Sequence, residues 1–248
     1  MVDDRGFDPA FDFTKEVGDK DPDEHSRTLR DYHKLLWSKP LPSGRMFDLE
    51  VTFDIERSRY FLHHQSSRGE FYLTSDSVMQ TWTRRGWKER MGEITEQVPD
   101  LERKEFLAIA HQIGGKVLFP GMMQVGRKQT INQVRGTNKD ICDRFDLTLE
   151  CIRLHYLGKR SHPLAEVLTR YWSFFELFDN FKGYTDFFLL QDLVSDDSSV
   201  VKSLIHPFTN FKESPLPGSP EAYQLYRENG ISFVQSRNRR MEAYVARL

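Results

Sequence analysis

The sequence predicts an α+β protein, and three observations support this fold class. Short segments rich in aromatic and β-branched residues cluster between positions 44 and 74, bounded by charged or glycine-containing turns. Helical spacing of apolar residues dominates the second half of the chain. Because the strands come first and do not alternate with helices, we expect short antiparallel strands in the N-terminal half, packed against a mainly helical C-terminal half.

The first 20 residues are acidic and irregular and carry Phe7, Phe11 and Phe13. Two interpretations stay open for this N-terminal arm: it docks its phenylalanines on the body of the protein, or it is a partly disordered, mobile tail. The rest of the chain shows no repeat and no linker that would divide it. With 248 residues it is long enough to bury a large core, so we expect a single domain over residues 1–248.

A helix is predicted to begin after Asp21, with Pro22 in its first turn, and to end before Pro40. Its apolar residues recur at i, i+3, i+4 and i+7 as far as Trp37, which is typical of a helix packed on the domain. His33 belongs to this apolar stripe and is interpreted as a packed core residue.

The remaining elements follow in order along the chain. Strands are predicted at residues 46–53, 59–65, 70–74 and 116–121, with a further candidate strand at 128–134. Helices are predicted from Ser75 or Asp76, within 88–112 on either side of Pro99, and at 139–157, 162–181 and 219–248, with a break at Gly183 and a proline-rich connection at 195–220.

Composition excludes several classes of protein. A net charge of −2 argues against a nucleic-acid coat or a polybasic membrane protein. The acidic N-terminus lacks the features of a signal peptide, and the longest apolar run, residues 187–190, is too short to cross a bilayer. Cys142 and Cys151 lie nine positions apart in one predicted helix, where they cannot pair. Two unpaired thiols suit a reducing compartment, so we expect a cytoplasmic protein with no membrane partner.

The predicted helix at 139–157 carries the candidate catalytic residues. Apolar residues form one face of it, and Asp143, Asp146, Glu150 and Arg153 fall within about 80° on the other. Leucines lie beside these charges, so we infer that the charged face is partly covered. Covered carboxylates could provide acid–base chemistry or hold a cation; the alternative is a structural ion-pair network.

A basic segment just before this helix carries the candidate ligand-binding residues Arg127, Lys128, Asn132 and Arg135. Cationic side chains and amides at the start of a helix suit an anion, especially a phosphate. The alternative is a solvated basic hairpin whose arginines pair with the acidic helix face. The glycine spacing matches neither the P-loop nor the dinucleotide-binding motif.

Other patterns receive structural interpretations. The aromatic residues between Tyr171 and Phe188 are not interleaved with basic ones, so we interpret them as core. The histidines show no metal-ligand spacing, and we assign no metal site. The arginines near the C-terminus, from Arg237 on, could contact RNA or phosphate, or could complement the helix dipole, which is the preferred interpretation.

Six segments together resemble an uncharacterised family of bacterial proteins, and the likeness keeps their order over most of the chain. They read TLRDYHKLLWSKPLP, IGGKVLFPG, TINQVRG, DRFDLTLECIRLHY, FFELFDNFKGYTDFFLLQDLV and RNRRM. The resemblance implies a bacterial cytoplasmic protein that acts as one intact unit. The resemblance carries over no activity and no catalytic residue, and the cofactor, if there is one, stays unknown.

Two functional hypotheses follow from the sequence. The first is an enzyme or binder of a phosphorylated ligand, either a nucleotide or a nucleic-acid end, in which the basic segment holds the anion and the acidic helix face acts on it. The second is a non-catalytic regulatory or protein-interaction protein, for example in a bacterial defence or toxin–antitoxin system. Its contact elements would be the phenylalanines of the arm or the 195–220 connection.

Overall fold

The computed structural model describes residues 6–55, 59–82, 85–122 and 129–248. Its sheet is an antiparallel meander in the order β1-β2-β3-β4. The strands are β1 Glu50–Asp54, β2 Arg59–Ser66, β3 Gly69–Ser77 and β4 Lys116–Met122. Pairing places Leu62 of β2 opposite Leu73 of β3, and Ser75 of β3 opposite Leu118 of β4. This sheet, followed by a mostly helical second half, confirms the predicted α+β class.

Three short helices precede the sheet: α1 Thr14–Val17, α2 Pro22–His25 and α3 Arg27–Trp37. The single helix expected here is two helices, because Ser26 adopts an extended conformation and its hydroxyl caps α3 at the backbone N–H of Leu29. Asp21 caps α2, as the sequence indicates. From residue 6 onward the arm lies on the body: Phe13 is fully buried, and the ring of Phe7 contacts Tyr32 at 4.7 Å between centroids.

The segment between β3 and β4 forms α4 Arg85–Thr95, α5 Asp100–Ala110 and the 3-10 turn η1 Ile113–Gly115. The prediction of a helix from Ser75 or Asp76 is wrong. Strand β3 continues through Ser77, because these residues pair with β4 as far as Lys116. The preference of serine and aspartate for helix caps is outweighed by the backbone hydrogen bonds that β3 makes with β4, a strand about 40 residues away in sequence.

The second half of the chain is helical. Its elements are α6 Ile131–Thr137, α7 Phe145–Tyr156, α8 Ala165–Arg170, α9 Trp172–Phe175, η2 Glu176–Phe178, α10 Phe181–Phe187, η3 Gln191–Leu193 and α11 Pro220–Val245. The predicted C-terminal helix is confirmed, with Ser219 as its cap. Residues 162–181, expected as one helix, are divided at Tyr171 and at Asp179, which has a φ of 62°.

Two further predictions in this half are wrong. In place of the candidate strand at 128–134, helix α6 begins at Ile131, because Thr130 and Gln133 form a capping box. The helix expected at 139–157 begins only at Phe145, since Cys142 and Asp143 both have positive φ. The break at Gly183 is absent: this glycine lies inside α10, where a Cβ would be 2.1 Å from a backbone oxygen of the preceding turn.

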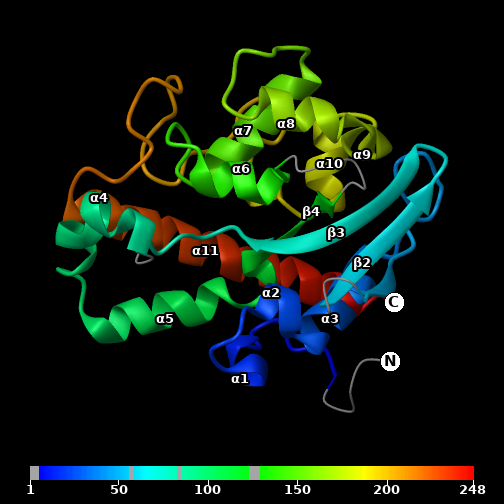
Figure 1. Cartoon of the computed structure of the whole chain (residues 1–248), viewed down its shortest axis with the longest axis horizontal. Helices are drawn as coiled ribbons and strands as arrows, with labels where there is room; N and C mark the ends of the chain where they lie inside the picture. The colour runs from blue at the N-terminus through cyan, green and yellow to red at the C-terminus, as the bar shows by residue number, and fades with distance from the viewer. Residues whose placement is uncertain (1–5, 56–58, 83–84, 123–128) are drawn as a thin grey trace.

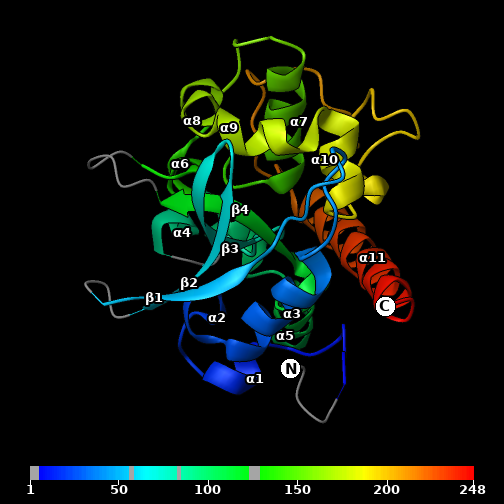
Figure 2. The ribbon, with the colours of Figure 1, turned by 90° about the vertical axis from the view of Figure 1, so that its right-hand side faces the viewer.

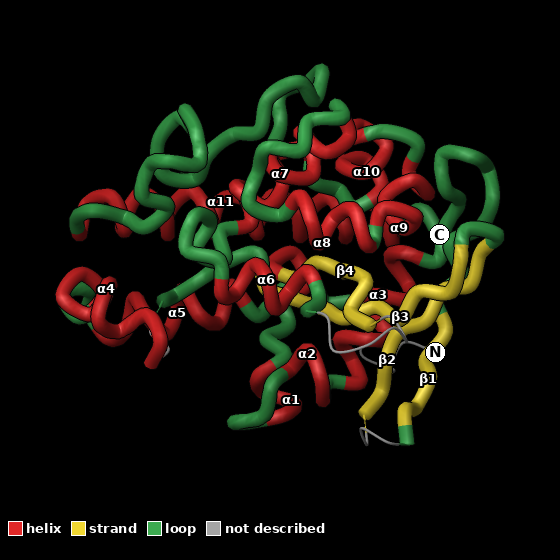
Figure 3. The backbone as a smooth tube through the Cα atoms, turned by 45° about the horizontal axis from the view of Figure 1, so that its top comes forward, coloured by secondary structure: helices red, strands yellow, loops and turns green. Residues whose placement is uncertain are grey.

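The sheet lies between two groups of helices. Figures 1 and 2 show α6 to α10 on one side of it and α1, α2, α3 and α5 on the other, with the long helix α11 running alongside. Strand β1 forms the outer edge, while β4 lies next to α6 (Figure 3). The aromatic run from Tyr171 to Phe188 packs into the core as predicted, with Phe174, Phe178 and Phe188 fully buried.

Two smaller predictions can also be compared with the structure. Cys142 and Cys151 are both free and buried, as expected, although only Cys151 lies on α7 and Cys142 is in the turn before it. Arg237 is fully buried and donates to the carbonyl oxygens of Phe188, Gly114 and Lys116, so it contributes no surface charge. Among the described residues, no helix combines the length and the apolar character needed to cross a bilayer.

Candidate functional site

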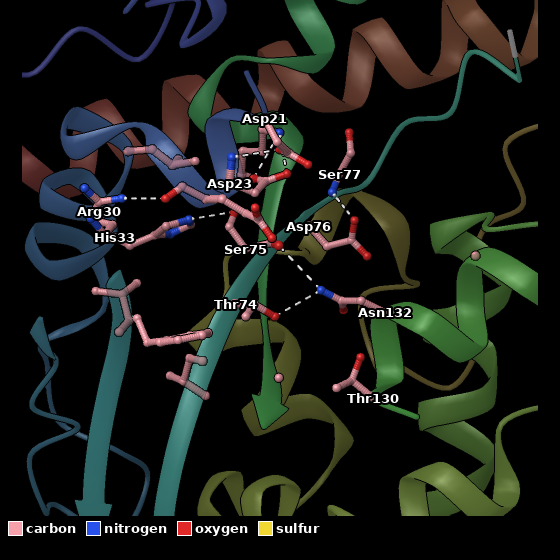
Figure 4. Close-up of a pocket in the computed structure, with 18 of the residues that line it drawn as sticks. Asp21, Asp23, Arg30, His33, Thr74, Ser75, Asp76, Ser77, Thr130 and Asn132 are labelled. Atoms are coloured by element: carbon pink, nitrogen blue, oxygen red, sulfur yellow. Dashed lines mark hydrogen bonds and ion pairs between the residues drawn. The ribbon is translucent and has the colours of Figure 1, made fainter. Parts of the chain in front are cut away.

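A cavity of about 350 Å³ lies where α2, α3, β3 and α6 meet. Its walls carry polar side chains from all four elements, and Figure 4 shows them converging on the end of β3. Side chains alternate along a strand, and this alternation directs Ser75 toward α3 and Asp76 toward α6. Segments far apart in sequence, at residues 21–33, 73–80, 111–121 and 130–143, therefore contribute to one site.

A chain of hydrogen bonds enters the cavity from α3. The indole N–H of Trp37 donates to Nδ1 of His33 at 3.0 Å, and Nε2 of His33 lies 3.1 Å from the hydroxyl of Ser75. Ser75 in turn hydrogen-bonds to the carboxylate of Asp23. His33 is only 1% exposed, and burial lowers its pKa to about 3, so the ring is neutral at ordinary pH.

The direction of these hydrogen bonds follows from the donors. An indole nitrogen can only donate, so Nδ1 of His33 is the acceptor and the ring proton is on Nε2. Nε2 then donates to Ser75, and Ser75 donates to Asp23. His33 therefore cannot remove a proton from Ser75, which excludes a serine nucleophile activated by this histidine. The chain instead fixes Asp23 as an ionised acceptor.

Asp23 is also paired with a buried cation. Nζ of Lys116 has no exposed surface and lies 3.2 Å from both carboxylate oxygens of Asp23. Burial acts to raise the pKa of Asp23, but the charge of Lys116 and the hydrogen bonds from Ser75 and Lys116 outweigh it, and the pKa is lowered. Asp23 is thus ionised at neutral pH.

Asp76 is in the opposite situation. It shares one guanidinium, that of the fully buried Arg135, with Asp143, whose Oδ1 lies 3.4 Å from Arg135. Burial raises the pKa of Asp76 to about 7, and the charges of Asp143 and Asp23 add to this effect against the attraction of Arg135. Burial is the largest cause of this shift, and a pKa of about 7 means that Asp76 is protonated in about half of the molecules at pH 7.

The structure separates the predicted site residues into three groups. Asp143 and Asn132 line the cavity, and Arg135 lies behind it in contact with Asp76. Arg127 and Lys128 lie outside the described residues. The other three, Asp146, Glu150 and Arg153, are on α7 and do not line the cavity.

These α7 charges are satisfied by their neighbours. Asp146 accepts two hydrogen bonds from Arg144, and its Oδ2 accepts a third from the backbone of Leu204 at 2.9 Å. Glu150 receives two hydrogen bonds of 2.7 Å from Arg153, one turn away on the same helix. Both arrangements have the form of the structural ion-pair network that the sequence left as an alternative, and Asp146 ties the 195–220 connection to α7.

The sequence pattern does not indicate Asp23, Ser75, Asp76 or Lys116 as site residues. Ser75 and Asp76 have the local character of a helix start, and Lys116 lies in a segment that shows only a strand pattern. Their chemistry depends on burial and on neighbours distant in sequence, which the spacing of residues cannot reveal. His33 is buried as predicted, but both of its ring nitrogens are hydrogen-bonded within the site.

The described residues contain no group of three or more histidines, cysteines or carboxylates arranged to hold a metal ion. The side chains that line the cavity can act as acids, bases and hydrogen-bond partners. Its polar atoms are carboxylates, hydroxyls and amides, supported by two cations without exposed surface.

Comparison with known proteins identifies the family. The model of a family of unknown function, DUF6994, matches residues 7–241, so the chain belongs to this family. The match covers every segment that contributes to the cavity. No curated protein and no solved structure matches the chain significantly.

Proposed function

We propose that this chain is an enzyme whose active site is the cavity, with Asp23 and Asp76 as an acid–base pair acting on a polar substrate. The observation that supports this best is that two carboxylates in opposite electrostatic environments line the same cavity. Environments that separate the pKa values of two carboxyl groups are typical of acid–base catalysis.

The roles of the two groups follow from their environments. Asp23, ionised and held by Lys116 and Ser75, is the general base that would accept a proton from water or from a substrate hydroxyl. Asp76 has a pKa near 7 and would donate its proton to a leaving group. A well-placed acid or base accelerates a reaction by about a hundredfold to ten-thousandfold.

The phosphorylated ligand inferred from the sequence stays a prediction. Its support from Arg135 is reduced, because this side chain has no exposed surface and donates to Thr148, to Asp76 and to the backbone oxygen of Ser77. The hypothesis now depends on Arg127 and Lys128. A bacterial origin and a cytoplasmic location also stay predictions.

A non-catalytic interaction protein is the second candidate, and one surface favours it. Val51, Phe53 and Ile55 occupy alternate positions at the outer edge of the sheet, and all three are exposed. The phenylalanines of the arm receive less support as contact elements, because Phe13 is buried and Phe7 and Phe11 pack against the core, while the 195–220 connection stays a prediction. This candidate predicts binding without any turnover.

Incubation of the purified protein with a library of polar metabolites, followed by mass spectrometry, tests the enzymatic proposal. For any substrate found, Asp23→Asn and Asp76→Asn should each lower kcat/KM by about a hundredfold or more. The matched control Asp186→Asn changes an exposed carboxylate paired with Lys182 and should leave kcat/KM unchanged.

The pH profile provides an independent readout. Activity should decline above about pH 7, where Asp76 loses the proton that it has to donate. It should persist on the acid side until Asp23 is protonated, below the ordinary range of an aspartate. Turnover that survives both substitutions, or that rises through pH 7, would show that these carboxylates are not the acid–base pair.

A further inference from the structure

The cavity presents an excess of negative charge to a ligand. Five carboxylates line it, and only two cations do so in the described part of the chain. The carboxylates are Asp21, Asp23, Glu24, Asp76 and Asp143, and the cations are Arg30 and Lys116. Since the site is also partly enclosed, these charges are less screened than they would be on an open surface.

The cations at this site are already engaged by the protein. Lys116 and Arg135 have no exposed surface, and both are paired with cavity carboxylates. Arg30, at the rim, lies over the ring of Tyr60 at 5.0 Å and donates to the backbone oxygen of Glu24. Among the described residues, the cations of the site are thus engaged by the protein, whereas carboxylate oxygens line the cavity as acceptors.

Asn132 gives an independent indication of the same kind. Its amide nitrogen donates to the hydroxyl of Thr74 at 3.1 Å, which fixes the orientation of the side chain. Its Oδ1 is buried and has no hydrogen-bond partner among the described residues. A buried acceptor without a partner is costly, so this atom is suited to an N–H or O–H group supplied by a ligand.

We propose that the substrate of this cavity is a small polyhydroxylated molecule that carries an amine, an amino sugar in chemical class. The ammonium group pairs with the carboxylate of Asp143, while Asp76 keeps the proton that it donates, and a neighbouring N–H or O–H group donates to Oδ1 of Asn132. The volume of about 350 Å³ is near the lower end of the range for small-molecule sites, which favours a ligand of about one ring. The proposal rests on the cavity being the active site.

Three sugars that share one ring and differ only at the sixth carbon form the test: 6-amino-6-deoxyglucose, glucose and glucose 6-phosphate. Calorimetry with the full chain at low salt measures their dissociation constants. The amine should bind at least about tenfold more tightly than glucose, and the phosphate should bind most weakly. Asp143→Asn should reduce the preference for the amine, whereas the control Asp186→Asn should not.

Each other outcome overturns the proposal. Tighter binding of glucose 6-phosphate would favour the phosphorylated ligand inferred from the sequence. Equal binding of all three sugars, or no binding of the amine at millimolar concentration, would show that the carboxylates of the cavity do not recognise an ammonium group. Failure of the acid–base proposal is distinguishable, because binding is measured without turnover: selective amine binding with no conversion of any substrate would leave the amine site standing.

Discussion

Replacing Asp76 by asparagine tests whether the folded protein raises the pKa of this carboxyl group, so that its ionisation destabilises the fold. Its pKa is raised from 3.8 to about 7 by burial and by the charges of Asp143 and Asp23. A raised pKa in the folded state means that the contribution to stability is fully present below about pH 3.8 and is lost as the pH rises through 7. Wild-type protein should therefore lose stability at this residue over the neutral range, and Asp76→Asn should not.

The size of the effect follows from the two pKa values. Between about pH 5 and about pH 8, protonation linkage at Asp76 amounts to about 2–3 kcal/mol. The asparagine oxygen can still accept the hydrogen bond from Arg135, and Asp143 remains as the charged partner. The free energy of unfolding of Asp76→Asn minus that of wild type should therefore be about 2–3 kcal/mol larger at the higher pH than at the lower one, so the variant is relatively more stable there.

Urea denaturation at the two pH values measures this difference directly. The comparison between pH values removes any constant cost of the substitution, such as a weaker hydrogen bond to Arg135. The control Asp186→Asn, at an exposed ion pair, should change stability by less than about 1 kcal/mol at either pH. A difference that is the same at both pH values would refute the reasoning, because Asp76 would then be an ordinary ionised partner of Arg135.

Two further predictions concern the supports of the site and of the core. Burial lowers the pKa of His33 to about 3, so its contribution to stability is present above about pH 6.5 and is lost as the pH falls. Because glutamine does not titrate, the free energy of unfolding of His33→Gln relative to wild type should rise by about 2–3 kcal/mol when the pH is lowered from about 7 to about 4.5. A pH-independent difference in urea denaturation would show that His33 titrates normally. Gly183→Ala should destabilise the protein by about 1–3 kcal/mol, because the added Cβ would meet a backbone oxygen at 2.1 Å, whereas Gly218→Ala, with no atom within 4 Å, should cost less than about 0.5 kcal/mol. Equal melting temperatures for the two glycine variants would contradict this account.

Local signals in the sequence were sufficient for most of the fold. The aromatic and β-branched residues of 59–65 and 70–74, bounded by turns, predict β2 and β3 from local composition. Ser219 and Pro220 mark the beginning of α11, since capping and the first helical turn depend on adjacent residues only. The aromatic run from Tyr171 to Phe188 indicates core without any knowledge of its neighbours.

The errors arose where two local signals compete, and at Ser75 and Asp76 residues distant in sequence decide between them. Ser75 and Asp76 have the character of a helix cap, but pairing with Val117 and Leu118 makes them part of a strand. The pattern around Ile131 suits a strand as well as a helix, and the capping box of Thr130 and Gln133 favours the helix.

The candidate site shows the same division more sharply. The sequence by itself identified Asn132, Arg135 and Asp143 as polar residues of interest, and these residues lie in or behind the cavity. Only the tertiary structure brings Asp23 and Asp76 to the same cavity, because one comes from an N-terminal helix and the other from the sheet. The physical reason is that burial and the charges of neighbours set the ionisation of a carboxyl group, and both are properties of the folded chain.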